Sequence, residues 1–214
     1  SDYERPLGFN ILEANNEEQK NMIINAFIAL LYKLYDPNHT GIIGPQLERA
    51  VRNIMLTAMY DKESTMIDVL RMIIDQQYHK KFLPIVQDPL VKRYWLDEIA
   101  KTSDFHKSEK MGYFVSKFDR FVTERIMRNI IAQPVSSLNF ANIMAEKKIL
   151  LVDLSKGKIG EENAIFLGLL FVPRILMAAF ERVNQLNKDA IPDFYLYVDE
   201  FQNFSTPDFA TILS

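Results

Sequence analysis

Apolar residues recur at helical spacing through residues 16–133 of the chain. Spacings of three and four residues place such side chains on one face of a helix, where they can pack against a neighbouring helix. Capping residues, or a proline at the first helical position, mark where these helices begin. The pattern predicts helices that start after Asn16, Gly44, Thr65 and Asp88, and one longer helix over residues 108–132.

The pattern changes after residue 147. Residues 148–154 and 193–200 are short apolar runs rich in branched and aromatic side chains, and a long helical pattern over 161–187 separates them. The first run is typical of a strand that is buried on both faces. The order strand, helix, strand predicts a βαβ unit with two parallel strands and a right-handed crossover.

The composition is that of an ordinary folded protein. The chain has 214 residues, of which 48% are hydrophobic, with 15 Phe, 9 Tyr and only 7 Gly, so a sizeable core can be buried. The absence of cysteine excludes disulfides, thiolate metal sites and cysteine nucleophiles, and suits a reducing compartment. The three histidines share no metal-ligand spacing, so we interpret them as surface or internally satisfied residues.

Charge and hydropathy restrict the classes of partner. The formal net charge of −3 argues against a domain whose whole surface binds nucleic acid, although local basic patches are compatible with it. The longest apolar candidate for a membrane span, residues 164–180, is interrupted by Pro173 and Arg174. We therefore expect no transmembrane segment in this chain.

Candidate chemistry lies at the end of the second apolar run. Asp199 and Glu200 follow four apolar residues, which is the Walker B pattern of ATP-hydrolysing proteins. A Mg²⁺ ion needs oxygen ligands, and an attacking water needs a carboxylate that orients and activates it. We expect Asp199 to hold Mg²⁺ through water and Glu200 to act as the catalytic residue. The alternative is that both acids only cap the following turn.

Several stretches resemble one family in the order in which that family has them. The segment YLYVDEFQNF at 195–204 resembles the Walker B region of type IV secretion ATPases and conjugative DNA-transfer coupling proteins of the HerA/FtsK-like group. Residues 5–10 (RPLGFN), 128–133 and 148–160 (KILLVDLSKGKIG) are similar to the same family. The resemblance spans nearly the whole chain and is densest after residue 120.

One motif of that family is missing. A Walker A loop needs the pattern G-x-x-x-x-G-K-[ST], so that backbone amides and a lysine can cradle phosphates. The only Gly-Lys pair, Gly157-Lys158, is followed by Ile159 and lacks the first glycine. We expect the chain to be an internal piece of a longer protein, with the phosphate loop upstream of Ser1. Such a piece would be inactive alone, with neither Mg²⁺ nor ATP bound.

The resemblance implies the fold and the domains. We expect an α/β, helix-rich chain: a partial RecA-like P-loop NTPase core with a small parallel sheet and an inserted helical subdomain. Residues 1–15 would form an extended segment of the motor core, residues 16–146 the helical subdomain, and residues 147–214 the βαβ part that ends just after Walker B.

The resemblance also implies partners and location. The whole protein would bind Mg²⁺ and ATP, move DNA or nucleoprotein, contact secretion-channel proteins and assemble as a homohexamer. It would lie in the cytoplasm, at the inner face of a membrane. A half-sheet with exposed edges would also favour dimerisation of the piece.

Other interpretations stay open. The helical region could be a protein-interaction module that binds a secretion partner or cargo, and a DNA-binding module without hydrolysis is a further class. Arg125 and Arg128 could supply an arginine finger, but we favour a solvated helix face for them. Phe201 and Phe204 could stack on single-stranded DNA, or they could pack beneath the loop.

Overall fold

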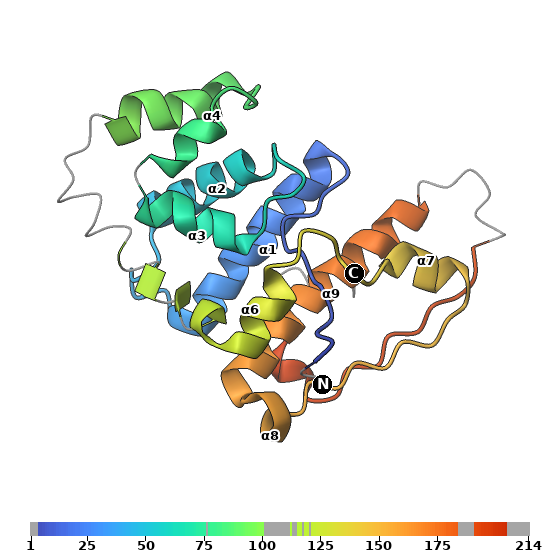
Figure 1. Ribbon diagram of the computed structural model, residues 1–214. Coiled ribbons are helices and arrows are strands. Elements are labelled where there is room, and N and C mark those ends of the chain that lie inside the picture. The colour runs from blue at the N-terminus through green and yellow to red at the C-terminus, as the bar shows by residue number, and fades with distance from the viewer. Residues whose placement is uncertain are drawn as a thin grey trace.

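Helices form all of the regular structure in the part of the chain that the structure describes. The computed structural model describes residues 4–75, 77–100, 112, 115–116, 118–119, 121–183 and 191–204. Figure 1 shows the helices as one assembly, with two extended segments running side by side along its edge. In chain order the elements are α1 (Glu17–Tyr35), α2 (Pro45–Ala58), α3 (Met66–Ile74), the 3₁₀ helix η1 (Tyr78–Lys81), α4 (Pro89–Arg93), the π-helix η2 (Tyr94–Ile99), α6 (Arg125–Ile131), α7 (Phe140–Ala145), α8 (Lys156–Ile159), α9 (Glu161–Val183) and the 3₁₀ helix η4 (Phe201–Asn203).

The predicted starts of the early helices are confirmed. The Asn16 side chain accepts a hydrogen bond from the Gln19 amide at 2.8 Å, which caps α1. Thr65 and Asp68 form the capping box of α3, and Asp88 caps α4. Each of these contacts spans only a few residues, so the local sequence is enough to specify it.

The predicted long helix over residues 108–132 is interrupted. Residues 101–111, 113–114, 117 and 120 lie outside the described part, but within it the chain bends at Glu124. The backbone of Glu124 is extended, with φ −73° and ψ 118°, and α6 begins at the next residue. The Asn163 side chain, on α9, donates a hydrogen bond to the Glu124 carboxylate at 2.6 Å. A contact from a distant helix therefore accompanies the break.

The predicted parallel sheet is wrong for the described chain. Residues 148–155 and 191–198 contain no strand, and the backbone groups of 149–154 and 193–198 form no hydrogen bond with any described residue. Strands pair only when their backbones lie about 4.8 Å apart. Here the two segments flank an open groove instead. The described part therefore contains no RecA-like core with a parallel sheet.

One hydrophobic core joins the early helices to α9. α1 packs along α9, and α7 and α8 contact the same helix. Phe121 stacks on Phe166 of α9 with ring centroids 3.9 Å apart, and Phe9 stacks on Phe171 at 4.7 Å. The core therefore extends across the predicted domain boundary at residue 146.

Length and composition would allow α9 to cross a membrane. Of its most apolar window, however, 72% is buried against the rest of the chain, as is usual for a core helix. One such helix is weak evidence for a membrane span, so the absence of a transmembrane segment stays a prediction.

The N-terminal segment is fixed by a buried asparagine. Asn10 is 1% exposed, and its side-chain amide donates to the carbonyl oxygens of Ser64 at 3.0 Å and Pro134 at 2.8 Å. Its side-chain oxygen accepts from the Leu12 amide at 3.0 Å. Arg174, on α9, also donates to the Asn10 carbonyl at 3.0 Å. The stretch 5–10, which the family resemblance singled out, thus contains a residue that joins three parts of the fold.

Candidate functional site

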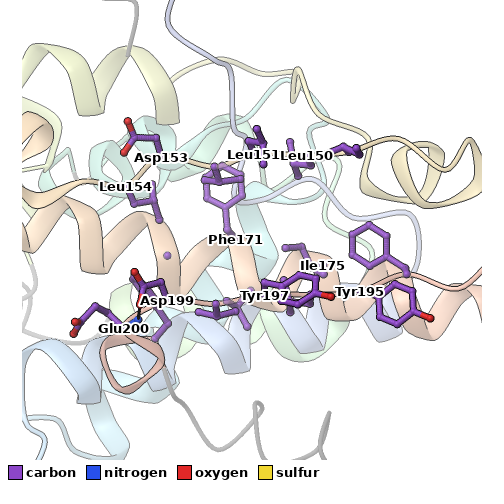
Figure 2. A pocket seen from close by; sticks show the side chains of 18 of the residues that line it. Leu150, Leu151, Asp153, Leu154, Phe171, Ile175, Tyr195, Tyr197, Asp199 and Glu200 are labelled. Carbon is purple, nitrogen blue, oxygen red and sulfur yellow. Dashed lines mark hydrogen bonds between the residues drawn. The ribbon is translucent and has the colours of Figure 1, made fainter.

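The two extended segments enclose a groove of about 1290 Å³. Residues 147–156 form one side of the groove and residues 192–200 form the other, while α9 contributes part of the lining. Figure 2 shows Phe171 and Ile175 between the two segments. The groove is therefore bounded on two sides by extended backbone and lined by the apolar side chains of a helix.

Side chains alternate in part along both segments, as they do in a strand, although Val152 between Leu150 and Leu154 is 44% exposed. Leu150 and Leu154 pack against the core, whereas Ile149 and Leu151 are each 89% exposed. On the other segment Phe194 packs against the core, Tyr195 and Tyr197 are 71% and 89% exposed, and Leu196 between them is 39% exposed. The interpretation that residues 148–154 form a strand buried on both faces is therefore wrong, since only one face has a packing partner among the described residues.

Carboxylates gather at one end of the groove. Both segments run in the same direction, so Asp153 of the first lies at the same end as Asp199 and Glu200 of the second (Figure 2). Asp153 lies across the groove from the other two. The sequence predicted the acidic pair, but it gave no sign that Asp153 lies opposite.

Backbone geometry presents Asp199 and Glu200 to solvent. Both residues are exposed, and an oxygen of the Asp199 carboxylate accepts from the Glu200 amide at 2.9 Å. Glu200 has a left-handed backbone, with φ 52°, and precedes η4. Its carboxylate accepts from the Gln202 side-chain amide at 2.5 Å. Neither acid forms an ion pair with a described residue, so both carboxylates can meet a cation from outside.

Asp153 is already paired. Its carboxylate lies 2.6 Å from the Lys158 ammonium and accepts from the Ser155 amide at 3.0 Å. The hydrogen bond from Lys158, with that from the Ser155 backbone, lowers the pKa of Asp153 below its ordinary value. Lys156 is likewise bound to Glu161, at 2.7 Å. The turn that carries α8 therefore has its two lysines engaged by carboxylates.

For a metal, the described residues at this end of the groove offer the adjacent carboxylates of Asp199 and Glu200, not a complete ligand set. No group of three or more metal-ligating side chains gathers among the residues the structure describes. Mg²⁺ commonly keeps several waters and binds through one or two carboxylates plus substrate phosphates. Asp199 fits that role through a bridging water, because its carboxylate forms no ion pair with a described residue. The assignments of Asp199 and Glu200 stay predictions.

Two other candidates have structural partners. Arg128, an exposed residue of α6, donates to the carbonyl of Val122, which precedes the break at Glu124, at 3.3 Å. The ring of Phe204 packs against Gly168 of α9, which favours packing over base stacking for this residue.

Comparisons with known proteins found no match: no protein-family model, no curated protein and no solved structure matches this chain.

Proposed function

We propose that this chain supplies the metal-binding and water-activating carboxylates of an ATP-driven motor of the type IV secretion and conjugation kind. The observation that carries the proposal is that the carboxylates of Asp199 and Glu200 are exposed and form no ion pair with a described residue. Both lie at the end of the groove, and Gln202 positions one of them. Carboxylates that only cap a turn do not need to be accessible to a cation from solvent.

The two acids take different roles in this proposal. Asp199 holds a water of the Mg²⁺ shell, since its carboxylate is exposed and its backbone position is fixed by the following turn. Glu200 accepts a hydrogen bond from the attacking water and orients it towards phosphorus. The Gln202 side chain donates to one Glu200 oxygen and leaves the other for that water.

The phosphate-binding loop comes from another polypeptide segment, because this sequence has no Walker A pattern. ATP affinity of the chain alone is therefore expected to be weak or absent. The remaining expectations, DNA or nucleoprotein as cargo, secretion-channel partners, a homohexamer and a cytoplasmic location, follow from the family resemblance.

The test compares this chain with a longer natural polypeptide that includes the residues preceding Ser1. Calorimetry should detect Mg²⁺-ATP binding only in the longer polypeptide, which should also hydrolyse ATP. Glu200→Gln should abolish turnover and spare binding, while Glu18→Gln, an exposed acid on α1, should change neither. Turnover that survives Glu200→Gln, or a longer polypeptide that binds no nucleotide, would remove this function.

A second candidate, a helical protein-interaction module, has its own support. Leu90 on α4 and Leu96 on η2 are 70% and 58% exposed, and exposed apolar side chains can contribute to a contact with another protein. Removing residues 147–214 would not test it cleanly, since α9 belongs to the shared core. Leu90→Asp with Leu96→Asp should instead prevent capture of a secretion-channel protein without changing thermal stability. Capture that persists would reject this candidate.

A further inference from the structure

We infer that the groove between residues 148–155 and 191–199 binds one extended polypeptide segment with an apolar centre and a basic residue at the end beside Asp199 and Glu200. The occupant is a segment of a partner protein that adds as a strand between the two extended segments. The inference concerns peptide binding, so it goes beyond the proposed ATPase function and does not depend on it.

Backbone groups on both sides of the groove have no hydrogen-bond partner among the described residues, which favours a strand as the occupant. The N–H and C=O groups of residues 149–154 and 193–198 form no hydrogen bond with any residue that the structure describes. Each residue carries a strong donor and a strong acceptor, and an extended peptide can pair with an open backbone edge. A strand placed between two such segments can form hydrogen bonds along both of its edges. A small molecule or a helix cannot use two rows of this kind.

The size and lining of the groove agree with a polypeptide occupant. Its volume, about 1290 Å³, exceeds the roughly 300–1,000 Å³ usual for small-molecule pockets. Each unbonded stretch is six residues long, so a strand that pairs with it along its length would span about 20 Å. Apolar side chains of α9 that line the groove, Phe171, Val172 and Ile175 among them, favour an apolar centre in the occupant.

Charge at the carboxylate end adds a basic requirement. Asp199 and Glu200 have no ion-pair partner among the described residues, whereas Asp153 is neutralised by Lys158 at 2.6 Å. Lys156, which lines the groove, is bound to Glu161 at 2.7 Å. Lys33 of α1 donates to the Gln202 carbonyl at 3.2 Å without pairing with Asp199 or Glu200. The acidic end therefore carries an excess of negative charge that a lysine or arginine of the occupant would neutralise.

The opposite end gives no comparable preference. Lys147 and Lys148 line it together with Asp193, and Lys148 is paired with Glu146 at 2.5 Å. Because charges of both signs lie there, only the end beside Asp199 and Glu200 favours a particular charge in the peptide.

The test uses synthetic ten-residue peptides with the centre Val-Ile-Val-Ile-Val and hydrogen–deuterium exchange of this chain, with no nucleotide present. Two peptides carry a Lys pair at the amino or at the carboxyl end, and two matched peptides carry a Glu pair instead. At least one Lys peptide should slow amide exchange about tenfold in residues 149–154 and 193–198 together. The matching Glu peptide should bind at least tenfold more weakly at low salt.

Variants separate backbone pairing from simple apolar adhesion. N-methylation of alternate amides in the active peptide should abolish protection, because it removes donors and leaves the side chains. Leu151→Pro should weaken peptide binding far more than Leu151→Ala, since both remove the same exposed side chain but only proline removes the amide. Asp199→Asn combined with Glu200→Gln should erase the preference for Lys over Glu.

Three results would overturn the inference. The first is the absence of protection with every peptide, and the second is equal binding of the N-methylated peptide. The third is a dimer, seen by sedimentation, that protects the same amides without any peptide, which would make a second copy the occupant. A longer polypeptide that does not hydrolyse ATP would not change the exchange, peptide-binding or sedimentation results. The ATPase proposal and the peptide-binding proposal can therefore be rejected independently.

Discussion

Gly168 of α9 lies directly against the ring of Phe204. A Cβ atom at this glycine would meet Cδ1 and Cε1 of the ring at 2.2 Å, far inside van der Waals contact. The contact joins the residues that follow Asp199 and Glu200 to the central helix. The position of the acidic pair therefore depends on the absence of a side chain at residue 168.

The first prediction concerns this contact. Gly168→Ala should lower the free energy of unfolding by about 1–2 kcal/mol, because overpacking costs about 1–3 kcal/mol and exceeds the helix-propensity gain of about 1 kcal/mol. In a Phe204→Ala background the same substitution should be neutral or stabilising. Urea denaturation of the four proteins in this cycle measures the coupling. Gly157→Ala, where a Cβ atom would meet no atom within 4 Å, is the control and should leave the free energy of unfolding unchanged. If Gly168→Ala changes the free energy of unfolding equally in both backgrounds, the contact with Phe204 is contradicted.

The second prediction concerns the turn after α1. Burial raises the pKa of Asp36, but hydrogen bonds from the Ile43 backbone, from Thr40 and from the Gly41 backbone outweigh it and hold the pKa at about 2. A depressed carboxyl pKa stabilises the fold at pH values above the unfolded pKa of about 3.9. That stability is lost as the pH falls from about 4 towards 2.

Urea denaturation between pH 2 and pH 7 tests whether the free energy of unfolding falls with pH as expected. Asp36→Asn should lower stability at pH 7 and make the curve shallower below pH 4, since an amide oxygen cannot accept all of these hydrogen bonds. Glu63→Gln, an exposed change in a different loop, should leave both features as in the unmodified chain. A curve for Asp36→Asn that falls as steeply below pH 4 would show that other groups are responsible.

The third prediction concerns the single tryptophan. The indole N–H of Trp95 donates to the Thr57 hydroxyl at 2.7 Å, and both residues are buried. Thr57→Val should destabilise by about 1–3 kcal/mol because it leaves that donor without an acceptor. Thr57→Ser, which keeps the hydroxyl, should cost only about 1 kcal/mol for the lost methyl group. Trp fluorescence during urea unfolding reads both values directly, and equal losses would argue against the hydrogen bond.

The fourth prediction concerns Asn10. Asn10→Asp would place a carboxylate against the carbonyl oxygens of Ser64 and Pro134, which the asparagine amide now serves as a donor. We expect a loss of about 3–5 kcal/mol at pH 7, comparable to an uncompensated buried charge. The loss should be smaller at pH 4, where a protonated carboxyl can donate to one carbonyl.

Thermal unfolding at both pH values measures this difference. Asn25→Asp, an exposed change on α1 beside Arg52, is the matched control and should have little effect at either pH. A loss at pH 4 as large as that at pH 7 would point to shape rather than charge as the cause.

Of the candidate site, the sequence predicted an acidic pair at the end of an apolar run but not its surroundings, and the roles of Asp199 and Glu200 stay predictions. The apolar run before Asp199 and Glu200 does form an extended segment that ends in those acids, and the segment rests on the helix that precedes it. The position of Asp153 across a groove, and its neutralisation by Lys158, could not be read from the pattern. Both depend on how α9 separates the two segments in space.

The sequence by itself determined the starts of α1, α3 and α4, because a cap such as Asn16 or Thr65 contacts an amide only two or three residues away. It also predicted that the apolar runs at 148–154 and 193–200 are extended, but not that only one face of the first would pack against the core. Only the tertiary structure decided where Glu124 interrupts a helix, since Asn163 approaches it from a distant part of the chain. It likewise decided that residues 149–154 and 193–198 have no strand partner among the described residues. Strand pairing requires two distant backbones to lie in contact, and the sequence of each segment contains no information about that distance.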